Sequence, residues 1–130
     1  MSRIFEVAVD GGPYALAAGP DGAMWVTLVH RGAIARVGPD GSLEVYPVAE
    51  GSRPSIITAG PDGALWFTRA GDDRIGRIST DGHLTSYELR SGSEPYGITS
   101  GPDGALWFTA TGTGVVGRID VDGEISEEAV

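Results

Sequence analysis

Gly-Pro-Asp-Gly-Ala-Leu-Trp-Phe-Thr, at Gly60–Thr68, is the most informative stretch of this chain, because it occurs three times. Close copies lie at Gly19–Thr27 and Gly101–Thr109, and the spacing is 41 residues each time. Near-identity at a fixed period of about 40 residues indicates one supersecondary unit that is copied and stacked. The chain is therefore predicted to be a repeat protein with three units.

Each unit contains four short runs of residues that favour β-strands, separated by turn residues. In the second unit the runs are Ser55–Ala59, Ala64–Arg69, Arg74–Ile78 and Leu84–Leu89. Each unit also carries two Asp-Gly pairs between such runs, and this pair is a strong signal for a tight hairpin. Four antiparallel strands in about 40–45 residues are typical of one β-propeller blade. We therefore predict an all-β fold built from three four-stranded antiparallel blades of 41 residues.

Two side chains recur at equivalent positions of every blade. The second strand carries a Trp, and we expect it to be apolar on both faces, because neighbouring blades cover both sides of each sheet. The third strand carries an Arg. We interpret this Arg as a structural residue that pairs with carboxylates of the fourth strand or of an adjacent blade. The recurring residues are Trp25, Trp66 and Trp107, and Arg36, Arg77 and Arg118.

The two ends of the chain raise the question of closure. We divide the chain into an outer closing strand (1–10) and three blades (11–50, 51–91 and 92–130). Ile4–Val9 resembles the later fourth strands, and Ile125–Ala129 is a fourth strand in its own right, so there is one strand candidate too many. Three blades do not close a propeller. The chain is thus either part of a longer propeller or half of a six-bladed homodimer, and its expected partner is the missing blades or a second copy.

Composition narrows the possible functions. The 130 residues suffice for one domain, and the absence of Cys excludes disulfides, thiolate metal sites and a cysteine nucleophile. A net charge of −9 argues against nucleic acid and against an anionic membrane surface as partners. No run is long and apolar enough for a signal peptide or a membrane span, so we expect a cytoplasmic protein.

The chain resembles the streptogramin lyase family, which is typified by virginiamycin B lyase, over essentially its whole length. The residues that carry the resemblance are Pro-Tyr-Gly-Ile-Thr at Pro95–Thr99, the Leu-Trp-Phe-Thr strand, Ile-Gly-Arg-Ile at Ile75–Ile78 and Val-Gly-Arg-Ile at Val116–Ile119. The resemblance implies a seven-bladed lyase about twice this long that confers antibiotic resistance. Such enzymes open cyclic depsipeptides by elimination, with a general base that removes a Cα proton and a bound magnesium ion, Mg²⁺.

The same resemblance implies where substrate and metal bind. The starts of the inner strands line the mouth of the central channel, and here they hold Tyr14, Ser55 and Tyr96. Glu-Pro-Tyr at 94–96 resembles a Glu-Pro-His stretch in the family's last blade, where Glu binds magnesium and His is the base. Glu94 is thus the candidate magnesium ligand, while Tyr96 stands where the base would be. The catalytic site of this chain is therefore expected to be incomplete.

Two further candidates come from the repeat itself. His30 and Arg31 lie in the loop between the second and third strands of the first blade, and neither recurs in the other blades. Functional side chains on a repeat scaffold tend to be such non-repeated polar residues in loops, so both are candidates for the channel mouth.

Two other functions stay open on the sequence. One is a non-catalytic propeller module that assembles into a closed dimer and binds a ligand or partner at its channel mouth. The other is a calcium-dependent lactonase of a related six-bladed type. The lactonase is the weaker alternative, because those sites use Asn and this chain has none.

Overall fold

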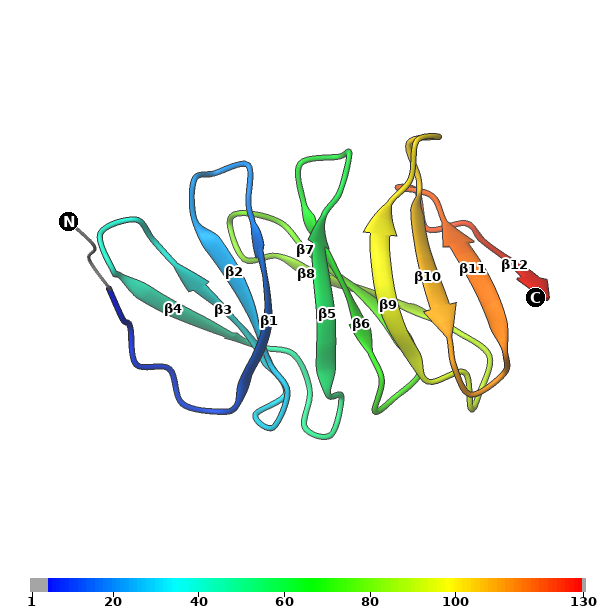
Figure 1. Cartoon of the computed structure of the whole chain (residues 1–130), viewed down its shortest axis with the longest axis horizontal. Coiled ribbons are helices and arrows are strands. Elements are labelled where there is room, and N and C mark those ends of the chain that lie inside the picture. The colour runs from blue at the N-terminus through cyan, green and yellow to red at the C-terminus, as the bar shows by residue number, and fades with distance from the viewer. Residues whose placement is uncertain (1–4, 130) are drawn as a thin grey trace.

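The computed structural model describes residues 5–129, which form three four-stranded antiparallel sheets with strand orders β1-β2-β3-β4, β5-β6-β7-β8 and β9-β10-β11-β12. Figure 1 shows the three sheets following one another along the chain. The all-β fold of three propeller blades is therefore confirmed. The strands are β1 (Pro13–Ala18), β2 (Met24–Leu28), β3 (Ala33–Val37), β4 (Leu43–Pro47), β5 (Pro54–Ala59), β6 (Leu65–Arg69), β7 (Arg74–Ile78), β8 (Leu84–Glu88), β9 (Pro95–Ser100), β10 (Leu106–Ala110), β11 (Val115–Ile119) and β12 (Ile125–Ala129).

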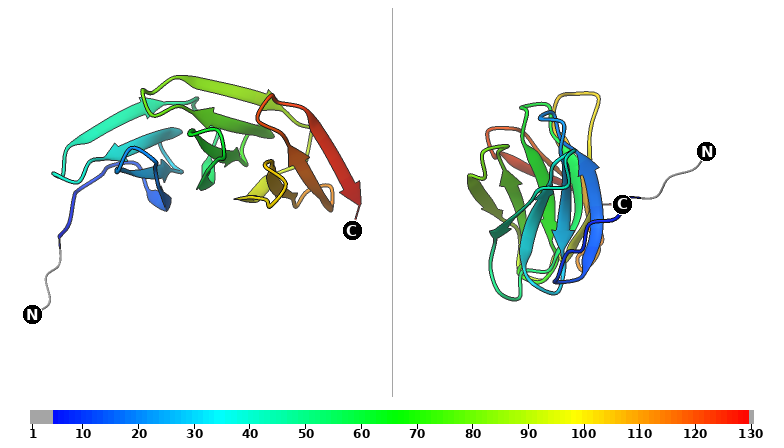
Figure 2. Two further views of the ribbon diagram at one scale, coloured as in Figure 1. Left: turned by 90° about the horizontal axis from the view of Figure 1, so that it is seen from above. Right: turned by 90° about the vertical axis from the view of Figure 1, so that its left-hand side faces the viewer.

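The three blades form an open arc. Their first strands, β1, β5 and β9, lie on the inner side of the arc, and their fourth strands lie on the outer side (Figure 2). Within residues 5–129 there is no helix of the length and apolar character that crossing a membrane requires. Blade 2 has a neighbour on each face, whereas blades 1 and 3 each have one face without a neighbouring blade.

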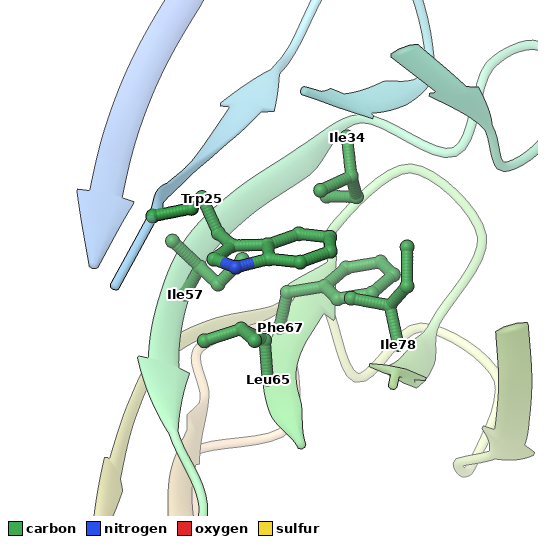
Figure 3. Packing of buried hydrophobic residues seen from close by; sticks show 7 residues of the cluster. Trp25, Ile34, Ile57, Leu65, Phe67 and Ile78 are labelled. Carbon is green, nitrogen blue, oxygen red and sulfur yellow. The ribbon is translucent and has the colours of Figure 1, made fainter. Parts of the chain in front are cut away.

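The core lies between the blades. Trp25 of β2 packs against Ile57 of β5 and Phe67 of β6, as Figure 3 shows. Trp66 makes the equivalent contact with Ile98 and Phe108 of blade 3. All five residues of β6 are buried, so neighbouring blades cover both faces of this strand as predicted, although its last two residues, Thr68 and Arg69, are polar.

The repeated Arg pairs mainly with a different carboxylate from the one predicted. Arg77 Nε donates to Asp62 Oδ2 at 2.9 Å, and Asp62 belongs to the turn between the first and second strands of the same blade. The other oxygen of Asp62 accepts a hydrogen bond from Trp66 Nε1 at 3.0 Å. The equivalent groups in blade 1 are Asp21, Trp25 and Arg36, and those in blade 3 are Asp103, Trp107 and Arg118. In blade 1 this Arg also reaches the fourth strand, where Arg36 lies 3.3 Å from Glu44.

The described part of the expected closing strand is not paired with any sheet. Residues 5–9 form no strand, while residues 1–4 of the predicted segment lie outside the described residues. Residues 5–9 instead lie beside blade 1, where Val9 packs against buried side chains of β2 and β3. The physical reason is that a strand needs the edge of a sheet, and β4, β8 and β12 already occupy the outer edges of all three blades.

Candidate functional site at the mouth of the channel

The inner strands begin in the same way in every blade. The residue before the first-strand proline has a positive φ in all three: 76° at Gly12, 50° at Arg53 and 46° at Glu94. This conformation is uncommon for residues with a side chain, and it concentrates at functional sites. The repeated turn delivers each following residue pair to the same end of the arc.

Tyr14 and Tyr96 meet at this end, although they come from the two outer blades. Their phenol oxygens are hydrogen-bonded to each other, and the two rings lie 6.4 Å apart at an interplanar angle of 67°. Both side chains are about half exposed. The hydrogen bond that Tyr96 shares with Tyr14 raises the pKa of Tyr96, so the Tyr96 phenol is protonated at neutral pH. The pair thus exposes two aromatic rings at this end of the arc, and one of its two phenol protons is not used in the bond between them.

Ser55 occupies the equivalent position of the central blade, but it is buried. Its hydroxyl donates to the carbonyl oxygen of Arg53 at 2.9 Å. Ser55 therefore lies at the start of its inner strand, but its hydroxyl is already bonded to the backbone.

His30 and Arg31 lie at the same end, since β2 runs antiparallel to β1 and ends beside Pro13. Both of their backbone N–H groups donate to the carbonyl of Gly11, at 3.1 and 3.2 Å. The His30 ring also packs over Gly12, where an added Cβ would lie only 2.3 Å from the ring. These two exposed side chains thus border the loop that leads to Tyr14.

Arg53 is a residue of this site that the sequence reading missed. With Glu94 and Tyr96 it lines a cavity of about 450 Å³, which Gly51, Ala70, Gly71 and Thr111 complete. The signal that would have found Arg53 is its spacing, because Arg53 precedes Pro54 as Glu94 precedes Pro95, 41 residues later. A cation and an anion therefore face the same cavity.

Glu94 is held in place by its backbone. Its N–H donates to Asp73 Oδ1 at 2.8 Å, and its carbonyl accepts from the Thr111 hydroxyl at 2.9 Å. The second carboxylate oxygen of Asp73 accepts a hydrogen bond from the Gly92 N–H, also at 2.8 Å. In residues 5–129 no three His, Asp or Glu side chains cluster as a metal site, so these residues do not by themselves fit a magnesium ion.

Comparison with known proteins agrees with this architecture. A curated virginiamycin B lyase from Mycobacterium sp. (strain KMS) is 76% identical over 53 residues, which are 41% of this chain and 18% of that protein. A solved streptogramin B lyase superposes with a TM-score of 0.91 and 42% identity, over 93% of this chain and 41% of that one. A catalytically inactive virginiamycin B lyase from Staphylococcus aureus, solved with quinupristin, superposes with a TM-score of 0.90 at 41% identity, over 93% of this chain and 42% of that one.

The chain thus spans less than half the length of these relatives. The family model described as the Virginiamycin B lyase family matches residues 2–130, which is nearly the whole chain. This chain therefore belongs to the virginiamycin B lyase family.

Proposed function

We propose that this chain is the substrate-binding part of a streptogramin B lyase-type propeller, which opens a cyclic depsipeptide by elimination. The single observation that carries the proposal is the Tyr14–Tyr96 pair, which joins blades 1 and 3 at one end of the arc. Family membership supports the reaction class, and the S. aureus relative, a catalytically inactive virginiamycin B lyase, was solved with quinupristin.

The side chains at the mouth suit binding better than proton abstraction. Tyrosine rings offer flat apolar surface to a macrocycle, and the phenol that remains a donor can hold a carbonyl oxygen. Arg53 adds a cation that can hold a second carbonyl. The position that the family resemblance assigns to the base holds Tyr96, whose pKa is raised, so a phenolate base is disfavoured there.

Magnesium enters this proposal only through the family resemblance. Glu94 supplies one carboxylate at the same end of the arc as Tyr14 and Tyr96. The neighbouring carboxylate, Asp73, already accepts hydrogen bonds from backbone N–H groups through both of its oxygens. We therefore assign the magnesium ligands and the base to blades beyond these three, and we derive no step through the metal.

Titration of the full chain with quinupristin in the presence of Mg²⁺ tests the proposal. We expect saturable binding, and Tyr14→Ala or Tyr96→Ala should each weaken it about tenfold, a loss of about 1.4 kcal/mol that is typical of a truncated aromatic contact. His83→Ala, at an exposed turn of blade 2, is the control and should bind as the parent does. No binding, or equal binding by all variants, would overturn the assignment.

Mass spectrometry of the incubated quinupristin separates binding from catalysis. We expect the compound to be recovered intact from this chain alone. A linear product of unchanged mass would place the base within these three blades. A product heavier by one water would mean hydrolysis and would overturn the elimination mechanism.

A further inference from the structure

Strained backbone is concentrated at one place in this molecule. Within residues 5–129, the residues other than glycine that have a positive φ are Arg53, Asp73 and Glu94. Arg53 and Glu94 line the cavity between blades 2 and 3, and Asp73 is bonded to the Glu94 N–H. A left-handed backbone costs free energy in a residue with a side chain, and such strain concentrates at functional sites. Asp73 has no part in the binding proposed above, so its strain needs another reason.

The position of Asp73 holds a glycine in the other two blades. Gly32 and Gly114 stand 41 residues to either side, with φ angles of 68° and 71°, and Asp73 has a φ of 56°. The backbone therefore makes the same left-handed turn before the third strand of every blade, and glycine makes this turn without strain. Blade 2 carries an aspartate instead, so the side chain must supply something that glycine does not.

Asp73 holds the link that leads from β8 to β9. Its backbone carbonyl accepts a hydrogen bond from the Leu89 N–H at 3.0 Å. Its two carboxylate oxygens accept from the Gly92 and Glu94 N–H groups, each at 2.8 Å. Hydrogen bonds from N–H groups to a carboxylate are stronger than those between neutral groups. One residue of blade 2 thus binds the connection to blade 3 at three points.

The link between blades 1 and 2 lacks the side-chain part of this arrangement. Gly32 accepts through its carbonyl from the Val48 and Ala49 N–H groups, at 2.9 and 3.1 Å, but it has no side chain that could reach further. The two links also lead to different residues of the site. The link held by Asp73 leads to Tyr96, whose hydroxyl bonds Tyr14, whereas the other leads to a buried serine. The additional bonds therefore occur where an exposed side chain has to be placed.

The position of the Tyr96 ring depends on this turn. Asp73 fixes the N–H of Glu94, two residues before Tyr96, and the proline between them has a fixed φ. Thr68 of blade 2 donates to the Tyr96 carbonyl at 2.7 Å. The ring has to reach Tyr14 on the far side of blade 2, and a hydrogen bond weakens steeply when its geometry departs from the optimum. A loosened turn would therefore separate the two hydroxyls.

We propose that Asp73 is a positioning residue of the binding site, whose carboxylate fixes the turn that enters blade 3 and so holds the Tyr96 hydroxyl against that of Tyr14. Asp73 acts on the pair through the backbone of Glu94. The use of the pair for binding rests on the proposed function, whereas its positioning needs no ligand. A pair that is ordered beforehand binds more tightly, because less conformational entropy is lost on binding.

A pH titration of the tyrosines in the full chain, followed by the ring Cζ signal of each in NMR, tests the positioning without a ligand. The hydrogen bond with Tyr14 raises the pKa of Tyr96 in the parent. Asp73→Gly gives blade 2 the residue of the other blades, and it should raise the acid dissociation constant of Tyr96 about threefold as the pair loosens. Asp73→Asn, which keeps one acceptor oxygen, should fall between. An unchanged Tyr96 titration in Asp73→Gly would overturn the proposal.

Asp120→Gly is the matched control. Asp120 also accepts from two backbone N–H groups, both in its own turn and each at 3.0 Å. This turn joins β11 to β12, at the opposite end of blade 3 from the turn that precedes β9. The variant should leave the titration of Tyr96 as it is in the parent. A change as large as that in Asp73→Gly would mean that any lost turn bond loosens the pair, and it would overturn a specific role of Asp73.

Quinupristin affinity then tests whether the positioning serves binding. Asp73→Gly should weaken binding about threefold, but it should have no further effect in a chain that already carries Tyr96→Ala, because Asp73 acts through Tyr96. A further loss of the same size in that background would overturn the action through Tyr96. No binding by the parent would overturn the proposed function alone, since the tyrosine titration still decides the role of Asp73.

Discussion

At the scale of single residues, one carboxylate in each blade organises two other side chains. Asp62 accepts from both the Trp66 indole and the Arg77 guanidinium, and so it satisfies the polar atom of a ring that is otherwise fully buried. Burial alone would raise the pKa of Asp62, but the hydrogen bonds from Trp66 and Arg77 outweigh it and lower that pKa. The charged form of this Asp is therefore part of the folded blade.

The repeated carboxylates make stability depend on acid. The hydrogen bond from Arg118, with that from Trp107, lowers the pKa of Asp103 from 3.8 to about 2. A carboxyl whose pKa is lower in the folded than in the unfolded chain stabilises the fold above its unfolded pKa, and that contribution disappears as the pH falls through the folded value. The urea concentration at the midpoint of unfolding should therefore decrease as the pH is lowered from about 4 to about 2. Asp103→Asn should flatten this decline, while Asp122→Asn, at an exposed turn, should leave it unchanged; parallel curves for both variants would contradict the assignment.

At the scale of strands, residues that face each other on the second and third strands of a blade are matched in size. Phe67 faces Gly76 in blade 2, and the same Phe–Gly pair recurs in blade 3. In blade 1 the pair is Val26 with Ala35. An added Cβ at Gly76 would lie 2.2 Å from the Phe67 ring, so the large ring requires the glycine opposite it.

This pairing predicts a compensated double substitution. Gly76→Ala should lower the free energy of unfolding by about 1–3 kcal/mol through overpacking. Adding Phe67→Val reproduces the pair of blade 1 and should recover part of that loss, because the ring that clashes is gone. Denaturant unfolding of both single variants and the double variant measures the coupling. Additive losses would show that the two side chains do not constrain each other.

The threonine between blades gives a second test at this scale. Thr68→Val leaves the Tyr96 carbonyl and the Ile56 N–H without their side-chain partner, and we expect a loss of about 1–3 kcal/mol in unfolding free energy. Thr109→Val is the matched control, because Thr109 accepts from the Gly97 N–H in the same way but donates to no further blade within the chain. At dilutions where the chain is a single copy, the control should cost clearly less. Equal costs would mean that the bond between blades contributes nothing.

At the scale of the whole molecule, stability is the sum of three blades and two interfaces between neighbours. Blade 2 takes part in both interfaces, and β6 at its centre is buried along its entire length. The end blades each rest on one neighbour only. The molecule is therefore expected to open from its ends.

Amide hydrogen exchange of the single chain checks this order of opening. We expect the slowest exchange in β6 and faster exchange in β2 and β10, although all three strands carry a Trp and a Thr at the same positions, because protection follows the free energy of local opening. Equal protection of the three strands would mean that the arc unfolds as one unit.

Much of this fold could be predicted because a repeat states its period openly. The predicted strands of blade 2 agree with β5 to β8 within one residue at each end, since glycine turns fix the boundaries. The predicted partner of Arg77 was wrong, because strand pairing places Arg77 opposite Trp66 and next to the turn that contains Asp62. That contact depends on three-dimensional proximity over 15 residues, which the period does not reveal.

The site was predictable as a place but only partly as a set of contacts. The period brings Tyr14 and Tyr96 to one end of the arc, but whether they touch depends on the curvature of the three blades. Ser55 is buried, and its hydroxyl bonds the Arg53 carbonyl, a contact that the repeat does not reveal. Arg53 was missed because its place in the site depends on a left-handed backbone conformation. The proline that follows Arg53 is the sign of this conformation in the sequence.

The matched pairs across the sheet also bear on how the chain finds its fold. A folding intermediate contains three second strands that carry a Trp and a Thr at the same positions, so a strand paired in the wrong blade would still bring these two residues to their usual places. Phe67 set against Ala35 would meet a methyl group where it needs an empty space, so β6 is rejected by the third strand of blade 1. Blades 2 and 3 share the Phe–Gly pair and have no such distinction. The sizes of the facing residues thus prevent the second strands of blades 2 and 3 from pairing in blade 1. They do not prevent β6 and β10 from exchanging places, so this exchange is the expected misfolding error.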